Sequence, residues 1–309
     1  MVLDGPKVVY GQMPPLRGHL ATCFTARAMP RVIDTWVNVN MGSREQPEYL
    51  RRVGKDYFKR EDEMFRDIAI DELIAAMDAA GVEKAILSTT AEKPPPDVLA
   101  FVEKHPERFA LSAQLDPRRG MKAIRALESL VRSQPVALAR IMPFLINLPP
   151  DDRVYYPVYA KCIELELPIS INTGIPGPPM PGKCQDPIYL DEVCLFFPEL
   201  KLVMAHGADP WWSVAIRLML KYPNLYMQTS AYAPKYLPAE LIHYMNTRGQ
   251  DKVMFASDHP VLPFERCISE AEALDFREGV LDKFLYTNAA KLFFTPSPQP
   301  LSQRERGST

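Results

Sequence analysis

The stretch "RVIDTWVNVNMGS", residues 31–43, begins as an apolar run and ends in polar residues. This pattern is typical of a barrel strand whose carboxyl end delivers side chains to a functional site. The tip of the stretch presents Trp36 and Asn38, where a metal site would need two histidines one residue apart. We therefore predict a strand-end site that lacks imidazole ligands at these two positions.

Seven more apolar runs follow, and each is separated from the next by a segment with helical spacing. Residues 70–81, for example, place Leu73, Ile74 and Met77 on one face and end at Gly81. The expected strands are residues 31–39, 82–90, 109–117, 135–144, 167–177, 199–212, 224–232 and 251–261. Alternating strands and helices predict a parallel sheet, and eight units predict closure into an α/β, (β/α)8 TIM barrel. An open doubly wound sheet is the alternative, but no Gly-x-Gly-x-x-Gly follows the first strand.

The chain divides into three parts. Residues 1–30 precede the first strand, and we expect an N-terminal arm that packs on the barrel or on a partner subunit. Residues 31–294 form the expected barrel. Residues 295–309 are rich in proline, serine and charge without apolar periodicity, which predicts a disordered tail with no role in chemistry.

Composition restricts the partners and the compartment. A net charge of −2 over 309 residues argues against nucleic-acid and anionic-membrane binding. The sequence has neither an apolar run of about 18 residues nor a signal-peptide pattern at its start. Its five cysteines form no C-x-x-C pair, which favours a reducing compartment. We therefore expect a cytoplasmic protein with no membrane or nucleic-acid partner.

Polar side chains recur where the expected strands end. After the first strand they are Arg140, Asn172, Thr173, His206, Gln228, Ser230, Ser257, Asp258 and His259. In a barrel all strand ends surround one mouth, so these side chains should meet there. Arg140 interrupts an apolar run and needs either an ion-pair partner or a carboxylate-bearing substrate.

Several ordered motifs resemble the amidohydrolase superfamily, in particular the amidohydrolase 2 branch with aminocarboxymuconate-semialdehyde decarboxylase and resorcylate decarboxylase. They are "VIDTWVNV" (32–39), "LPISINTG" (167–174), "KLVMAHGADPWW" (201–212), "VMFASDHPV" (253–261) and "NAAKLF" (288–293). The resemblance covers residues 31–294 and implies a barrel enzyme that acts on a small molecule. It also implies a homodimer.

The metal site that this resemblance implies is altered in this chain. In the family, two histidines on strand one, a histidine on strand five and an aspartate on strand eight bind one divalent ion. Trp36, Asn38 and Asn172 stand at the three histidine positions, and Asp258 alone remains. A carboxamide oxygen is a poor zinc ligand and an indole is none. We therefore expect no metal and no other cofactor; weak binding through His206 or His259 is the alternative.

His206 and Asp258 are the predicted catalytic residues. The resemblance implies an acid/base or substrate-polarising role for His206, and a carboxylate beside it would orient the imidazole for proton transfer. An ionised Asp258 would hold the pKa of His206 near or above 6.5. The alternative is a buried histidine that bonds a backbone group.

The predicted substrate-binding residues are Trp36, Asn38, Arg140, Asn172, Trp211 and His259. The two asparagines suit either an inactive scaffold or donors to a substrate carbonyl or carboxylate. Trp36 either plugs the place of the metal or forms the wall of a pocket for an aromatic or aliphatic substrate. The proline-rich loop 173–187 suits a lid, and its Cys184 is an alternative nucleophile.

These features favour a metal-independent hydrolase of an ester, lactone or thioester that uses the His206–Asp258 pair. One alternative is a carboxy-lyase for an aromatic or unsaturated carboxylic acid, whose electron sink would have to be the substrate itself. The other is a non-catalytic binding pseudoenzyme. An open cavity shared by His206 and Asp258 would favour an enzyme, and a cavity filled by Trp36 would favour the binding protein. In each case the partner is a small molecule with a carboxylate or carbonyl group.

Overall fold

The computed structural model describes residues 30–43 and 46–295. Its strands are β1 (Val32–Val37), β2 (Val82–Thr90), β3 (Phe109–Gln114), β4 (Val136–Ile141), β5 (Ile169–Asn172), β6 (Leu202–Ala205), β7 (Leu225–Gln228) and β8 (Val253–Met254). They pair in chain order, every pair parallel, which confirms the predicted barrel. The expected arm, apart from Pro30, and the expected tail, apart from Thr295, lie outside the described residues.

The seam between β8 and β1 is held by a few bonds instead of a full ladder. The Thr35 N–H donates to the Phe255 carbonyl at 3.3 Å, and the Asn38 N–H donates to the His259 carbonyl at 2.8 Å. The buried carboxyl of Asp34 adds a side-chain bridge, because it accepts from the Ser257 N–H at 3.1 Å. The barrel is therefore nearly closed, and its seam runs beside the candidate site.

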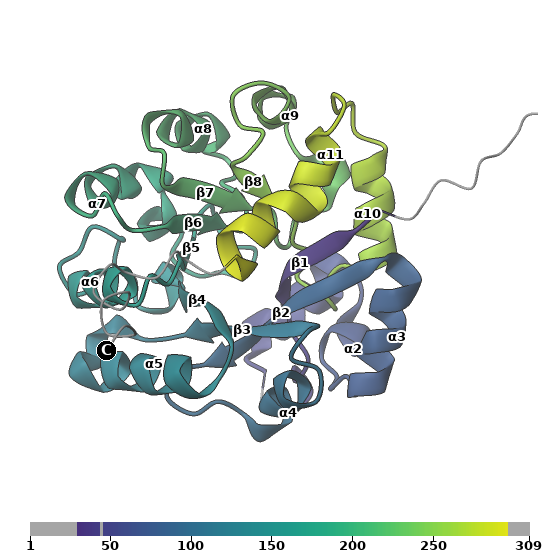
Figure 1. The fold of residues 1–309 in the computed structure, drawn as a ribbon, viewed down its shortest axis with the longest axis horizontal. Coiled ribbons are helices and arrows are strands. Elements are labelled where there is room, and N and C mark those ends of the chain that lie inside the picture. Colours follow the sequence, from purple (N-terminus) through teal and green to yellow (C-terminus); the bar gives the residue numbers. More distant parts are fainter. Residues whose placement is uncertain (1–29, 44–45, 296–309) are drawn as a thin grey trace, which may run out of the picture.

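Helices surround the barrel (Figure 1). The main ones are α3 (Ile70–Ala80), α4 (Pro96–Lys104), α5 (Met121–Ser133), α6 (Tyr156–Glu164), α7 (Leu190–Phe196), α8 (Trp212–Lys221), α9 (Ala239–Met245) and α10 (Phe264–Glu272). Each buries one apolar face against the strands. In α5, for example, that face carries Ala123, Ile124, Leu127 and Leu130. No helix in the described part of the chain is long and apolar enough to span a membrane.

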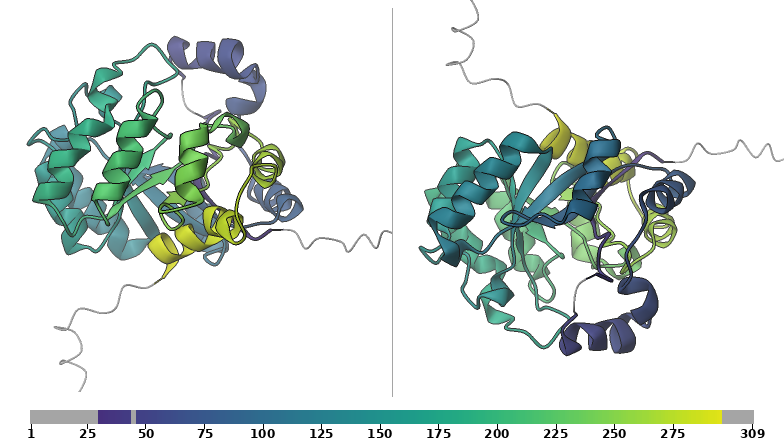
Figure 2. Two further views of the ribbon diagram at one scale, coloured as in Figure 1. Left: turned by 90° about the horizontal axis from the view of Figure 1, so that it is seen from above. Right: turned by 90° about the horizontal axis from the view of Figure 1, so that it is seen from below.

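Two helical excursions lie at opposite ends of the barrel (Figure 2). The first follows β1 and contains α1 (Glu48–Arg52) and α2 (Glu61–Met64). The second contains α11 (Val280–Asp282) and runs on to Phe294, where Phe293 and Phe294 pack on Ile86 and Leu138 inside the barrel. The C-terminal segment therefore closes the amino end, and the carboxyl strand ends lie on the side of α1 and α2.

Candidate active site

The indole of Trp36 occupies the centre of the strand-end region. It is 5% exposed and packs with Ala205 and Ala256. Its ring centroid lies 4.5 Å from that of His206. The guanidinium carbon of Arg140 lies 4.2 Å from the ring centroid of Trp36 on an adjoining side. The structure therefore brings three of the predicted site residues together, and Trp36 fills the space between them.

Asp258 joins this group through Asn38 and the backbone of Trp36. The Asn38 Nδ2 donates to Asp258 Oδ1 at 2.8 Å, and the Asp258 N–H donates to the Trp36 carbonyl at 3.1 Å. Burial raises the pKa of Asp258 to about 7, while the hydrogen bond from Asn38 and the positive charge of Arg140 act in the opposite direction. A substantial fraction of Asp258 is therefore protonated near neutral pH and can donate a proton.

His206 has a different partner from the one predicted. Its Nδ1 lies 3.1 Å from the Ser230 carbonyl, and because a carbonyl only accepts, Nδ1 carries the proton. Burial and the charge of Arg140 lower the pKa of His206 to about 4. Among the described residues no hydrogen bond joins His206 to Asp258. The predicted His206–Asp258 pair is therefore wrong as a hydrogen-bonded unit, since Nδ1 bonds a backbone carbonyl instead. The predicted pKa near or above 6.5 is also wrong, because burial outweighs the hydrogen bond to Ser230, which acts to raise the pKa.

Both of these residues have a left-handed backbone, with φ 64° for His206 and φ 64° for Asp258. Side chains other than glycine rarely adopt this conformation, which costs roughly 1–3 kcal/mol and clusters at functional sites. Gly207 follows with φ 67°, and a Cβ there would lie 2.2 Å from the Trp212 ring. The chain therefore turns sharply after β6, and only glycine fits the second position of that turn.

The other three predicted residues lie in different surroundings. Asn172 ends β5 and is 2% exposed, so it lies inside the barrel. His259 stacks on Phe264 of α10, with ring centroids 4.1 Å apart and an angle of 12°. Its ring therefore packs against an outer helix. Trp211 lies half-buried in the turn before α8.

The tryptophan that supports the His206 turn is Trp212 instead of Trp211. Trp212 is 5% exposed, packs under Gly207, and donates from Nε1 to Asp209 Oδ1 at 3.2 Å. The sequence does not indicate which of the two adjacent tryptophans packs under the turn. Cys184 is also unsuited to its alternative role as a nucleophile, because burial raises the pKa of its thiol.

Sequence reasoning missed Asp34 and Ser88. Asp34 is fully buried and accepts from the Trp36 N–H at 3.0 Å, and burial raises its pKa to about 7. Ser88 accepts from Arg140 Nη1 at 2.8 Å. Asp34 carried a usable signal, since a carboxylate inside an apolar run needs a purpose just as Arg140 does. Nothing in the sequence indicated Ser88, because its contact with Arg140 depends on how the strands are placed.

The residues at this site do not fit a divalent ion. An indole lies at one ligand position, and it is packed between an imidazole and a guanidinium. At another, Asn38 points an N–H donor, and not an oxygen, at Asp258. No group of three or more His, Cys, Asp or Glu side chains suited to a metal occurs among residues 30–43 and 46–295.

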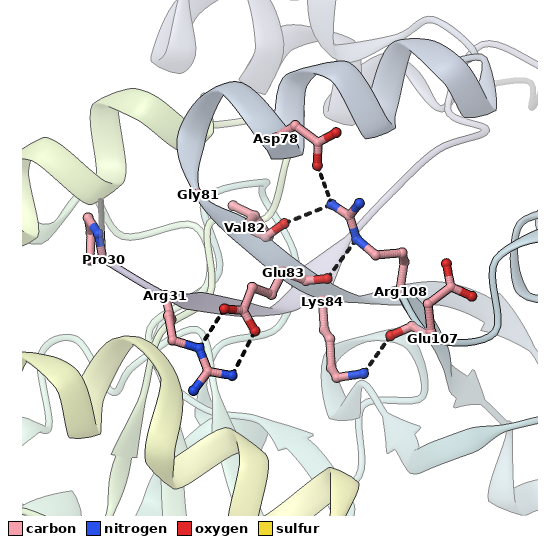
Figure 3. Close-up of a pocket in the computed structure, with 9 residues that line it drawn as sticks. All are labelled: Pro30, Arg31, Asp78, Gly81, Val82, Glu83, Lys84, Glu107 and Arg108. Carbon is pink, nitrogen blue, oxygen red and sulfur yellow. Dashed lines mark hydrogen bonds and ion pairs between the residues drawn. The ribbon is translucent and has the colours of Figure 1, made fainter. Parts of the chain in front are cut away.

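One cavity lies at the other end of the barrel, at the start of β1 to β3 (Figure 3). Its volume is about 470 Å³. Its charged side chains already pair with one another, Arg31 with Glu83 and Arg108 with Asp78. Neither this cavity nor four others among the described residues are lined by Trp36, His206 or Asp258. With its indole only 5% exposed, Trp36 closes the strand-end site.

Comparisons with known proteins agree with this architecture. A family model described as amidohydrolase matches residues 33–295. No curated protein matches the chain. An uncharacterised TIM-barrel protein from Bordetella bronchiseptica is 23% identical with a TM-score of 0.71, covering 85% of this chain and 98% of that one. The 2,6-dihydroxybenzoate decarboxylase from Rhizobium is 20% identical with a TM-score of 0.64, covering 86% and 99%.

A third solved structure carries a metal. The 5-carboxyvanillate decarboxylase from Novosphingobium aromaticivorans, complexed with manganese and 4-hydroxy-3-methoxy-5-nitrobenzoic acid, is 17% identical with a TM-score of 0.60. The match covers 85% of this chain and 96% of that one. Likeness at these identities establishes the shared barrel fold. The chemistry of the present site has to be argued from its own residues.

Proposed function

Because this chain belongs to the amidohydrolase family, we propose that it is a carboxy-lyase that removes the carboxyl group of a small aromatic carboxylic acid without a metal ion. The observation that carries this proposal is that the Arg140 guanidinium packs on the Trp36 ring while the Asp258 carboxyl interacts with both Trp36 and Arg140. Solved structures with the same fold include decarboxylases of aromatic carboxylates. This interpretation, which the sequence placed second, is better supported than the hydrolase.

Each of the two residues has a role in this reaction. Arg140 binds the substrate carboxylate through its planar fork of N–H donors. Protonated Asp258 transfers its proton to the ring carbon that bears the carboxylate. The bond to the carboxylate carbon then breaks, its electron pair restores the aromatic ring, and carbon dioxide leaves. Asp258 regains a proton from solvent, so one proton is consumed for each substrate.

Hydrolysis would need a base that this site does not supply. A pKa near 4 makes His206 a weak base, and its Nδ1 proton is held by the Ser230 carbonyl. Asp258, with its pKa raised to about 7, suits proton donation better than the activation of water. The hydrolase prediction relied on a hydrogen-bonded His206–Asp258 pair, so it is less well supported than the carboxy-lyase.

A non-catalytic binding protein is the second candidate, and the packing of Trp36 favours it. The indole is 5% exposed and closes the site, so turnover requires it to move. A binding protein would retain aromatic carboxylates without releasing carbon dioxide. Product analysis therefore separates the two candidates.

The test is a carbon dioxide assay with hydroxylated benzoates in the presence of a metal chelator. The active enzyme should release carbon dioxide under these conditions. Asp258→Asn should lower the rate about 10²–10⁴-fold, the usual effect of a positioned general acid. Asp251→Asn is the matched control, because Asp251 is exposed and precedes β8 at the opposite end of the barrel. An Asp258→Asn protein with the wild-type rate would refute the mechanism.

We also propose a homodimer in a reducing cytoplasmic compartment. The four described cysteines, Cys162, Cys184, Cys194 and Cys267, are all free, which agrees with such a compartment. Three large apolar side chains of the α7 region, Ile188, Leu195 and Phe196, are exposed. Surface of this kind suits a contact between subunits.

A further inference from the structure

A layer of small polar side chains lies inside the barrel below Trp36. The strand register pairs Ser88 with Ser112, and Arg140 with Ser170. Paired residues on adjacent parallel strands project from the same face of the sheet. All four are buried, at 6%, 2%, 4% and 0% exposure in that order. TIM barrels usually fill this space with bulky branched residues, so a polar layer here needs an explanation.

A second row of residues lies nearer to the carboxyl ends of the strands. Asn172 follows Ser170 by two residues, so it projects from the same face, and it pairs with Ala205. The pairing of β6 with β7 then brings Gln228 beside Ala205 on the next strand. The indole of Trp36 packs on Ala205, whose strand lies between those of Asn172 and Gln228. Trp36 therefore covers the polar interior.

Several polar atoms in these two layers have no hydrogen-bond partner among the described residues. They are Ser112 Oγ, Ser170 Oγ, Asn172 Oδ1, and both Nε2 and Oε1 of Gln228. A buried polar atom without a partner costs about 1–3 kcal/mol. Such atoms usually mark the place of an ordered water or a ligand. Five of them on one interior face indicate a site with an occupant.

We propose that Ser112, Arg140, Ser170 and Gln228 form an interior chamber that binds the carboxylate end of the substrate, with Asn172 in its wall and Trp36 as its door. A carboxylate accepts about four hydrogen bonds. The chamber supplies the guanidinium together with three neutral donors, the two serine hydroxyls and Gln228 Nε2. This inference rests on the proposed function, since it assigns the carboxylate of that same substrate to the chamber.

The contacts of Trp36 suit a side chain that moves. The apolar contacts of the indole are with Ala205 and Ala256, whose methyl groups do not interlock with it as larger side chains would. Its attraction to Arg140 is of the cation–π kind, worth roughly 0.5–2 kcal/mol. An incoming carboxylate replaces this attraction with charge-assisted hydrogen bonds to Arg140. The closed form should therefore dominate in the free protein, and opening should precede binding.

The door is tested by stopped-flow fluorescence with salicylate as the probe. In the wild type the observed binding rate should level off at high salicylate, at the rate of door opening. In Trp36→Ala it should rise linearly with concentration and exceed the wild-type plateau at least tenfold. Trp36→Phe keeps an aromatic door and should keep a plateau. An unchanged plateau in Trp36→Ala, or a wild-type binding rate that rises linearly with salicylate, would refute the proposal that Trp36 gates the chamber.

The chamber is tested with Ser170→Ala and Gln228→Leu. Both should weaken salicylate binding at least tenfold, while the Tm of the free protein stays level or rises, because an unpartnered buried polar group has been replaced by an apolar one. Thr89→Val is the matched control. Thr89 is 1% exposed and follows Ser88, so its hydroxyl is buried on the opposite face of β2. Its salicylate affinity should stay within about twofold of the wild type.

The outcomes separate this inference from the proposed function. Salicylate binding that depends on Ser170 and Gln228, without carbon dioxide release from any hydroxylated benzoate, supports the chamber and refutes only the carboxy-lyase. Carbon dioxide release and salicylate affinity that both survive the two substitutions refute only the chamber.

Discussion

Arg140 lies over the indole face of Trp36, with its guanidinium carbon 4.2 Å from the ring centroid. This contact places a permanent positive charge at the strand ends, since the guanidinium stays protonated at any working pH. The charge lowers the pKa of Asp258 against the larger effect of burial, and it also lowers the pKa of His206. Arg140 thus supplies the positive charge that acts on both Asp258 and His206.

Replacing Arg140 should weaken carboxylate binding and raise the pKa of Asp258 further. A charged hydrogen-bonding group contributes about 1.5–3 kcal/mol, so Arg140→Met should weaken salicylate binding about 10–150-fold. Arg140→Lys should recover part of this loss, because lysine restores the charge without the planar fork. Fluorescence titration measures the affinity, and infrared titration of the carboxyl follows Asp258. Wild-type affinity in Arg140→Met would contradict the assignment.

The fold was predictable because hydrophobic periodicity and turn residues recur in every unit. Residues 82–90 were expected as a strand and are β2, since Gly81 marks its start as a helix stop with φ 76°. The last strand was less predictable. Residues 251–261 were expected to be extended, yet β8 contains only Val253 and Met254. The following residues bond to β1 through a few backbone hydrogen bonds and through the side chain of Asp34, a contact across 223 positions.

The site was predictable in its residue types and less so in its contacts. The sequence predicted that Trp36, Arg140, His206 and Asp258 would be neighbours, because each stands near the end of an expected strand. The partner of His206 left no trace in the sequence, because a left-handed turn and the path of β7 bring the Ser230 carbonyl to it. Backbone carbonyls are present at every residue. Spacing alone therefore could not separate this partner from Asp258.

His206 should make the protein less stable as the pH falls from about 6.5 to about 4. Its folded-state pKa of about 4 lies below the ordinary 6.5, so the unfolded chain binds the proton first in this range. The wild type should lose about 2 kcal/mol relative to His206→Gln between about pH 7.5 and about pH 4.5. Asp34, Asp258 and His259 also titrate, but they are present in both proteins and cancel in the difference. Urea unfolding at both pH values measures it, and equal losses in the two proteins would refute the prediction.

The homodimer should depend on the apolar face of α7. Leu195 is 59% exposed and Phe196 is 68% exposed, so both can be changed to serine without a loss of core packing. Light scattering should give twice the chain mass for the wild type and a mixture shifted toward monomer for the double variant. Tyr236→Ser is the matched control, since Tyr236 is 66% exposed but lies between β7 and α9. A wild-type monomer at micromolar concentration would contradict the prediction.

Purified protein should carry well under one equivalent of zinc or manganese, and restoring three histidines should change that. Zinc needs about four strong donors, and Asp258 alone is too few. The triple variant Trp36→His, Asn38→His, Asn172→His would return three imidazoles beside Asp258. It would also remove the indole from the place of the ligands, together with the Nδ2 donor that Asn38 directs at the carboxylate. The triple variant should bind about one equivalent of zinc, which a chelator removes. Elemental analysis of both proteins provides the measurement, with circular dichroism to show that the barrel persists. Stoichiometric metal in the wild type would refute the prediction that this site binds no metal. A folded triple variant that binds no zinc would show that the side chains at these four positions do not converge on one ion.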